Sequence, residues 1–154
     1  MLLEPRLKAA ASPNKDWGWG RWSELARQLT RQGHVVAQFT EPGEAVLPGV
    51  EAIPTAGFRE ACAVLARVRL AVLPEGGLHH AAAALGTPSI VIFGGFISPR
   101  QTGYSHQVNL FTGGTPCGMR RHCSHCELAM RRVAVDEVLM KARMLAAATA
   151  DAAL

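Results

Sequence analysis

The sequence predicts an α/β protein with a Rossmann-like, doubly wound parallel sheet and helices on both of its faces. Runs of apolar residues without polar alternation, such as 70–73 and 89–93, are typical of parallel strands buried on both sides. Segments with the apolar spacing of helices separate these runs, and such alternation favours a parallel sheet. A chain of 154 residues, of which 49% are hydrophobic, is long enough for one domain with a substantial core.

The amino-terminal part begins with a short apolar segment, Met1 to Leu3, which could belong to a strand. A helix is predicted at 21–32, because apolar residues recur there at i, i+3, i+4 and i+7 and Gly33 follows as a stop signal. The recurring residues are Trp22, Leu25, Ala26 and Leu29. The segment 34–39 is the next predicted strand, and it ends at a turn that contains Glu41.

The central unit, 70–99, has the pattern strand, turn, helix, strand. Its first apolar run stops at Pro74, an alanine-rich helical segment starts with His79 and His80, and a turn at 86–88 leads into the second run. The remaining predicted elements are a minor strand at 50–53, a helix at 58–67, a strand at 108–111, an irregular segment at 113–121 and a helix at 135–150 that opens with acidic residues.

Three tryptophans, Trp17, Trp19 and Trp22, fall within six residues. Rings so close together could stack on a base, but packing where a loop meets a helix is the commoner reason, and we favour it. Cys62 is expected to fill the core as a small hydrophobic residue on the apolar face of the second helix.

Charge and hydropathy narrow the class of protein. The formal net charge is +4, and the basic residues are dispersed apart from Arg120-Arg121 and Arg131-Arg132. Such a surface suits phosphorylated small molecules as well as nucleic acid, so charge alone does not choose between them. The sequence has no unbroken apolar segment of about 18 residues, so no membrane span is predicted. The amino terminus, where Glu4, Pro5 and Arg6 follow two leucines, does not resemble a secretory signal, and cytoplasmic residence is the default expectation.

The turn after the first central strand is the strongest candidate for a ligand site. Gly76 and Gly77 carry no side chain that would obstruct a ligand, and they lie where a helix begins with unpartnered amides that attract anions. Glu75 stands at the carboxyl end of a strand, which is where open α/β sheets bind their ligands. Glu75 could instead cap the helix, but its place beside two glycines favours a ligand role. Arg100, in the loop after the second strand, could touch a phosphate or an acceptor.

Several separate motifs occur in an order that resembles the carboxyl-terminal half of the heptosyltransferase-like glycosyltransferases, family 9 of the GT-B superfamily. They are Lys15-Asp16-Trp17, Glu41, the segment from Glu75 to Ala81, Leu85-Gly86-Thr87-Pro88, Phe93-Gly94 and a cysteine-containing tail. The most specific motif is an acidic residue, two small residues, an apolar residue, one free position, His and Ala, followed by Leu-Gly-Thr-Pro. The likeness covers nearly the whole chain, so residues 1–154 are expected to form a single donor-binding domain with a cysteine-containing loop at 113–130.

The resemblance implies a nucleotide-sugar donor, typically ADP-heptose, bound in the cleft between two Rossmann-like domains. Carried over to this sequence, Lys15 would approach the diphosphate, Glu41 the ribose hydroxyls, Glu75 the transferred sugar, Gly76 and Gly77 the phosphates through their amides, with Leu78 beside them, and His80 the phosphate region. Lys15 and His80 would stabilise the charge of the leaving diphosphate, so no metal is required for transfer. The partner is a nucleoside-diphosphate sugar, and no nucleic acid is expected.

The sequence departs from the family pattern in two respects. The acidic position is more often Asp followed by Ser or Thr, so Glu75-Gly76 leaves the identity of the sugar open. The amino-terminal half, which supplies the acceptor site and the general base, is absent from this chain, and it would have to come from the same or another polypeptide. The resemblance implies inverting transfer to a lipopolysaccharide or other surface glycan, with the enzyme at the inner membrane surface, although no amphipathic anchor is evident.

Three cysteines crowd the carboxyl-terminal part: Cys117, Cys123 and Cys126, with His122 and His125 between them. Three thiolates and one imidazole, from either histidine, could bind zinc, and the Cys-x-x-Cys spacing fits it. Reduced structural thiols compete with this interpretation and are favoured, because a zinc site usually draws on two separate segments. The alternatives to a transferase are a stand-alone nucleotide-binding module and a zinc- or redox-linked interaction protein.

Overall fold

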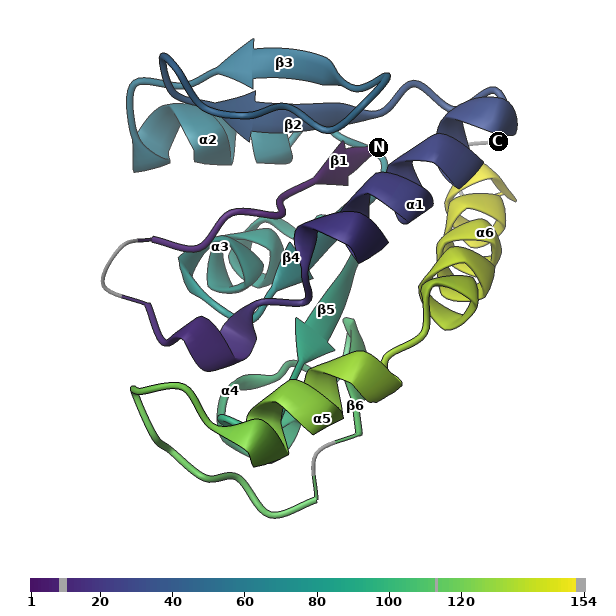
Figure 1. Ribbon diagram of the computed structural model, residues 1–154. Helices are drawn as coiled ribbons and strands as arrows, with labels where there is room; N and C mark the ends of the chain where they lie inside the picture. Colours follow the sequence, from purple (N-terminus) through teal and green to yellow (C-terminus); the bar gives the residue numbers. More distant parts are fainter. Residues whose placement is uncertain (9–10, 113, 152–154) are drawn as a thin grey trace.

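The computed structural model describes residues 1–8, 11–112 and 114–151. Residues 150 and 151 are described by their backbone only. Its centre is a six-stranded, entirely parallel sheet with the order β3-β2-β1-β4-β5-β6 (Figure 1). The strands are β1 (Leu2–Leu3), β2 (Ala37–Thr40), β3 (Glu51–Pro54), β4 (Ala71–Pro74), β5 (Ser89–Phe93) and β6 (Val108–Phe111). This order is that of the Rossmann fold, so the predicted doubly wound parallel sheet is confirmed.

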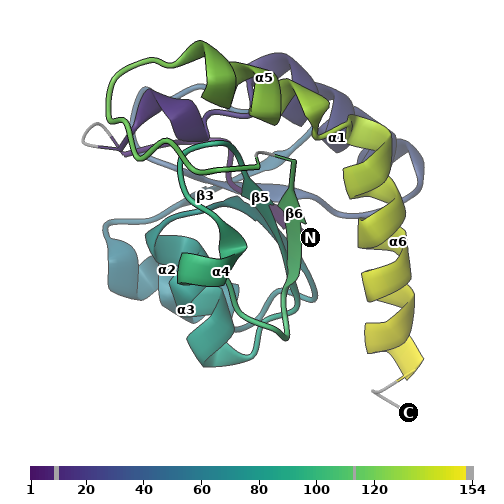
Figure 2. The same ribbon diagram turned by 90° about the horizontal axis from the view of Figure 1, so that it is seen from below.

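Helices cover both faces of the sheet (Figure 2). They are the short 3-10 helix η1 (Pro13–Lys15), α1 (Trp19–Arg31), α2 (Phe58–Leu65), α3 (Gly77–Leu85), α4 (Pro99–Thr102), α5 (Ser124–Arg132) and α6 (Val135–Asp151). One hydrophobic cluster packs the sheet against α1, α5 and α6, and a second packs it against α2 and α3. None of the described helices is both long and apolar enough to cross a membrane.

Strand β1 has only two residues but lies at the middle of the sheet, between β2 and β4. Leu3 faces the cluster under α1, whereas Leu2 faces the cluster under α2 and α3, and both side chains are fully buried. The chain moves outward from β1 to β3 and then returns to the other side of β1 to start β4. The order of the strands therefore reverses between β1 and β4, at a topological switch point.

The cysteine-containing segment differs from the expected loop at 113–130. The chain is irregular over 114–123, but α5 begins at Ser124, so the second half of the segment is helical. Cys126, Ala129 and Met130 form the buried face of α5 at i, i+3 and i+4. Two arginines follow at once, and this short apolar stripe is easily missed in the sequence. Gly113, where the irregular segment was expected to start, lies outside the described residues.

The tryptophans are used for packing, as expected, at two of the three positions. Trp17 and Trp22 are 1% exposed and meet edge to face with their ring centroids 5.0 Å apart. Trp17 also donates its indole N–H to the carbonyl oxygen of Val133 at 2.9 Å, which ties η1 to the end of α5. Trp19 lies on the surface.

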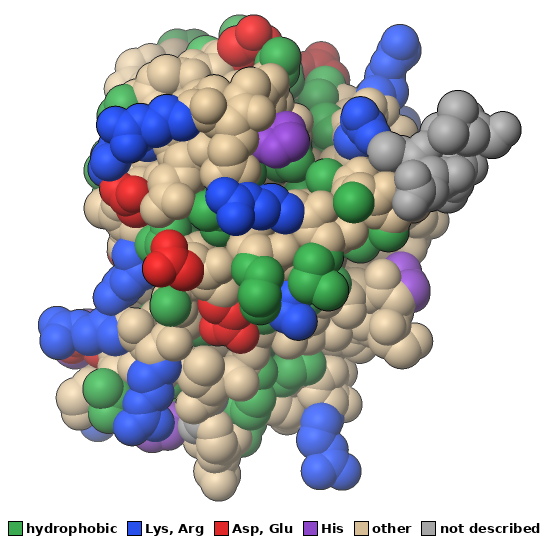
Figure 3. Space-filling model, turned by 90° about the vertical axis from the view of Figure 1, so that its right-hand side faces the viewer, with side chains coloured by type: hydrophobic (Ala, Val, Ile, Leu, Met, Phe, Trp, Pro, Cys, Tyr) green, Lys and Arg blue, Asp and Glu red, His purple; other side chains and the backbone are tan. Residues whose placement is uncertain are grey.

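The basic residues are dispersed on the face of the molecule shown in Figure 3. On the face shown in Figure 3, Lys and Arg side chains stand apart from one another among polar and apolar ones. The described residues of this face form no continuous basic patch of the kind that tracks a nucleic-acid backbone.

Candidate functional site

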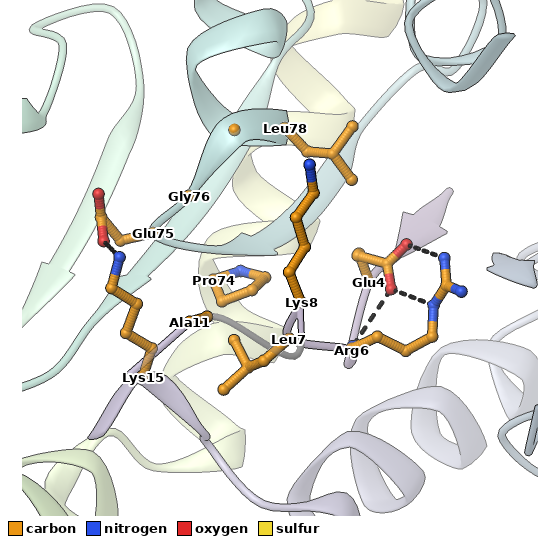
Figure 4. A pocket seen from close by; sticks show the side chains of 11 residues that line it. Glu4, Arg6, Leu7, Lys8, Ala11, Lys15, Pro74, Glu75, Gly76 and Leu78 are labelled. Atoms are coloured by element: carbon orange, nitrogen blue, oxygen red, sulfur yellow. Dashed lines mark hydrogen bonds and ion pairs between the residues drawn. The ribbon is translucent and has the colours of Figure 1, made fainter. Parts of the chain in front are cut away.

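A cavity of about 310 Å³ opens at the carboxyl ends of β1 and β4 (Figure 4). It is lined by Glu4, Arg6, Leu7, Lys8, Ala11, Lys15, Pro74, Glu75, Gly76, Gly77 and Leu78. These residues come from the segment after β1 and from the turn between β4 and α3, on either side of the switch point. Ligands of open α/β sheets bind at this place, and the volume is in the range of small-molecule sites.

Lys15 and Glu75 form an ion pair on the wall of this cavity, and Figure 4 shows their side chains pointing toward each other. The Lys15 side chain is 17% exposed and that of Glu75 is 7% exposed. The ammonium of Lys15 also lies 5.0 Å from the ring centroid of Phe96. Because Lys15 ends η1 while Glu75 directly follows β4, the pair joins two segments that are 60 positions apart in the sequence.

A second charged pair, Glu4 and Arg6, lines the opposite side of the cavity in Figure 4. Arg6 donates from Nε to Glu4 Oε1 at 2.8 Å and from Nη2 to Glu4 Oε2 at 3.2 Å. Burial raises the pKa of Glu4, and the hydrogen bonds and charge of Arg6 oppose this rise. The sequence interpretation missed both residues and Lys8. The signal was present, because they follow β1 as Glu75 follows β4, but a two-residue strand was not recognised as the centre of the sheet.

The start of α3 is capped by His79 and not by Glu75. The N–H of Gly76 donates to His79 Nδ1 at 2.9 Å, so Nδ1 is an acceptor and Nε2 carries the proton. Nε2 then donates to the carbonyl oxygen of Thr102 at 2.9 Å. Burial lowers the pKa of His79, which is fully buried. His79 is therefore a neutral residue that fixes the glycine turn.

The two glycines leave the mouth of the cavity open. A Cβ added to Gly76 would meet no atom within 4 Å, and one added to Gly77 would only touch the ring of Phe58, at 3.6 Å. The amide of Gly76 is used by His79, so it is not directed at a ligand in this structure.

Three of the predicted site residues lie outside the described lining of the cavity. His80 is hydrogen-bonded through Nδ1 to the hydroxyl of Tyr104 at 3.0 Å, although its ring nitrogens still lie within 4.8 Å of the Glu75 carboxylate and of His79. Glu41 and Arg100 are exposed. Glu41 directly follows β2, and its N–H donates to Glu44, which in turn pairs with Arg6 at the cavity.

A second cluster lies where the cysteine-containing segment meets α5. Ligand atoms of Cys117, Cys123, His125 and Cys126 are all within 4.8 Å of one another, so these residues could hold a metal ion. The sequence left the histidine open, and the structure places His125 in the cluster. His122 instead lies 3.3 Å from the carboxylate of Glu127.

Comparisons with known proteins agree with this architecture. Residues 6–129 match the family model described as glycosyltransferase family 9 (heptosyltransferase). No curated protein matches the chain.

Among solved structures, the ADP-heptose LPS heptosyltransferase II of E. coli aligns with 94% of this chain and 45% of its own, at a TM-score of 0.72 and 20% identity. The E. coli heptosyltransferase WaaC with ADP-2-deoxy-2-fluoro heptose aligns with 93% of this chain and 42% of its own, at a TM-score of 0.67 and 17% identity. The iron-containing dodecameric glycosyltransferase TibC of enterotoxigenic E. coli H10407 aligns with 94% of this chain and 44% of its own, at a TM-score of 0.73 and 17% identity. The chain thus shares their fold and spans less than half of the length of each.

Proposed function

Because this chain belongs to glycosyltransferase family 9 (heptosyltransferase), we propose that it is the half of a glycosyltransferase that binds the nucleotide-sugar donor, with ADP-heptose or a similar sugar nucleotide as that donor. The observation that carries the proposal is the Lys15–Glu75 pair at the switch point of the sheet. It offers a cation for a diphosphate and a carboxylate for sugar hydroxyls within one cavity. WaaC, a structural neighbour, has been solved with an ADP-sugar analogue.

The charges of the cavity suit the chemistry of sugar transfer. Breaking the bond between the sugar and the diphosphate leaves negative charge on the leaving oxygen, and a cation already in place stabilises that charge best. Lys15 is held close to this position by Glu75 and by the ring of Phe96. Lys8 and Arg6 line the same cavity and add positive potential. In this arrangement the side chains supply the stabilisation for which other transferases use a metal ion.

The roles proposed for the remaining site residues are those that the sequence analysis expected. Glu75, freed from Lys15 when a diphosphate binds the ammonium, accepts hydrogen bonds from the sugar. Glu41 reaches the ribose hydroxyls from the end of β2, the strand beside β1. His80 supports the phosphate region from behind Glu75. Arg100, on α4, contacts a phosphate or the acceptor.

The acceptor and the general base belong to an amino-terminal half, in the same or a separate polypeptide, since the chain spans less than half of its structural neighbours. Transfer proceeds by direct displacement with inversion. The acceptor is a lipopolysaccharide or another surface glycan, and the enzyme works on the cytoplasmic side of the inner membrane. The short span also supports a second candidate, a nucleotide-binding module without transfer activity. An in-frame second Rossmann-like half upstream of Met1 would decide for the transferase, since only the transferase needs one.

Calorimetry of the purified chain tests donor binding. We expect ADP and ADP-heptose to bind, and Lys15→Ala to weaken both by about 10- to 100-fold, because a charge-assisted contact is lost. Glu75→Gln should leave ADP binding nearly intact and reduce the preference for ADP-heptose over ADP by about tenfold.

Matched controls for these variants lie on α6, away from the cavity. Lys141→Ala and Glu137→Gln remove the same charges and should leave both affinities within about twofold of the original chain. The proposal is wrong if the original chain binds neither ligand, or if Lys15→Ala binds as well as Lys141→Ala.

A further inference from the structure

Outside the donor cavity, three cysteines and a histidine converge from two segments of the chain. Cys117 lies in the irregular segment after β6, whereas Cys123 directly precedes α5 and His125 and Cys126 lie in its first turn. Their four ligand atoms lie within 4.8 Å of one another. We propose that Cys117, Cys123, His125 and Cys126 bind one zinc ion in tetrahedral coordination.

The two segments have the local geometry of metal-binding turns. At Cys117, the N–H of Met119 donates to Sγ at 3.4 Å, and Gly118 between them has a φ of +63°, which favours glycine. An amide that points at the sulfur stabilises the negative charge of a thiolate and fixes its direction. Cys123 is the N-cap of α5, where the partial positive charge of the helix start favours thiolates. The sequence suggested one compact loop, whereas the structure supplies two distinct turns.

The rest of the protein holds these turns in place. The N–H groups of Cys117 and Gly118 donate to the carbonyl oxygens of Gly95 and Phe96 at 2.8 and 3.0 Å. The buried side chain of Asn14 donates to the carbonyl oxygens of Met119 and Arg121, at 2.7 and 2.8 Å.

Asn14 also joins the two turns, because its Oδ1 accepts the N–H of Cys123 at 2.9 Å. Gly95 permits the close approach of α5, since a Cβ there would lie 2.8 Å from the ring of His125. The ligands are therefore oriented by contacts that do not depend on a metal.

The chemistry of the ligands favours zinc over reduced structural thiols, which the sequence favoured, and over a disulfide. Thiolates and imidazole together suit zinc, and four protein ligands leave no open position, as in structural zinc sites. The sulfurs of Cys117 and Cys126 are 2.9 Å apart and need to separate to about 3.8 Å around zinc. A disulfide between these two residues would leave the convergence of Cys123 and His125 unexplained, and so would simple packing of reduced thiols.

The zinc would fasten the irregular segment 114–123 to α5. Asn14 is hydrogen-bonded to this segment, and the residue that follows Asn14 in the sequence is Lys15 of the donor cavity. The metal site thus supports the segment that presents Lys15. Only this link to Lys15 rests on the proposed function, whereas metal binding itself does not.

Metal analysis of the full chain, purified under reducing conditions, tests the site. We expect one zinc per chain by mass spectrometry. Cobalt(II) should replace it and give the intense visible absorption of tetrahedral coordination together with thiolate-to-metal charge transfer. Cys117→Ser and Cys126→Ser should each weaken zinc binding by more than about 100-fold, and His125→Ala by at least about tenfold.

Two controls come from the chain itself. Cys62→Ser removes the cysteine that lies outside the cluster, and His122→Ala removes the histidine that pairs with Glu127, so both should keep one zinc. Circular dichroism checks that each variant is folded, and chelator titration of the unmutated chain gives the affinity without any mutation. Absence of zinc, zinc retained by folded Cys117→Ser, iron in place of zinc, or a Cys117–Cys126 disulfide found after alkylation would each overturn the proposal.

Discussion

His79 and His80 show how neighbouring residues of one type come to have different tasks. Both lie in the first turn of α3, and the sequence offered no reason beyond the family pattern to rank one above the other. His79 is buried because Thr102, from α4, supplies the acceptor for its Nε2, and His80 turns outward to the hydroxyl of Tyr104. These partners are more than 20 positions away in the sequence, so this division of roles could not be predicted locally.

His79 should make the stability of the protein depend on pH. Its folded-state pKa is lowered from 6.5, chiefly by burial, so its neutral form stabilises the fold above that value, and this stabilisation is lost as pH falls through the folded-state pKa. Protonation would also place a hydrogen on Nδ1, against the N–H of Gly76. We expect the free energy of unfolding in urea to fall by about 1 kcal/mol between about pH 7.5 and about pH 5 through this residue.

The comparison of His79→Gln with the unmutated chain isolates this contribution, because Glu4, whose pKa is raised, changes stability in the opposite direction. His79→Gln should show a flatter pH dependence of stability than the unmutated chain. An unchanged pH dependence in folded His79→Gln would show that His79 is not the titrating group.

At the scale of elements, the contact between α5 and the end of β5 depends on a glycine. A Cβ at Gly95 would lie 2.8 Å from the His125 ring and 3.1 Å from the Cα of Cys126, so Gly95→Ala must displace the start of α5. We expect a loss of about 1–3 kcal/mol in the free energy of unfolding, measured in urea.

A glycine-to-alanine substitution in α1 should instead raise the free energy of unfolding. A Cβ added to Gly20 meets no atom within 4 Å, and alanine favours a helix more than glycine does. Gly20→Ala should therefore stabilise the protein by about 0.5–1 kcal/mol. Equal effects of the two variants would mean that α5 does not pack closely on Gly95.

The elements also show which parts of the fold are visible in the sequence. Strands β5 and β6 have the predicted bounds, because each is a mainly apolar segment between turns. The predicted strand at 34–39 starts later, at Ala37, since the preceding residues form the turn after α1. The helix α5 was missed because its burial depends on the glycines after β5, a contact between segments 30 positions apart.

For the whole molecule, the position of the site follows from the topology. The rule that open α/β sheets bind ligands at the carboxyl ends of their strands predicted a site beside Glu75, and the cavity lies there. The other wall, with Glu4, Arg6 and Lys8, was missed, because the two-residue strand β1 was not recognised as the central strand. Lys15 came from the family resemblance alone, since η1 reaches Glu75 only through the tertiary fold.

The two proposed sites should be coupled through Asn14. Asn14 is hydrogen-bonded to the segment that zinc would hold, so removal of the zinc should leave Lys15 less firmly positioned. We therefore expect a chelator to weaken ADP binding by about 3- to 10-fold in calorimetry. In Lys15→Ala the affinity for ADP should be the same with and without zinc. An equal chelator effect in both proteins would place the coupling elsewhere.

The shortness of β1 has a mechanical consequence for the sheet. On one flank β1 pairs with β2 in a register that includes only Leu2 and Ala37, and on the other it pairs with β4 through both of its residues. Backbone pairing in the sheet is therefore shortest between β1 and β2, next to the centre of the sheet. Bending of β3-β2 relative to the other strands should meet the least resistance there. The cavity opens at the carboxyl ends of β1 and β4, so a molecule bound in it would link β1 to the β4 side and stiffen the centre of the sheet.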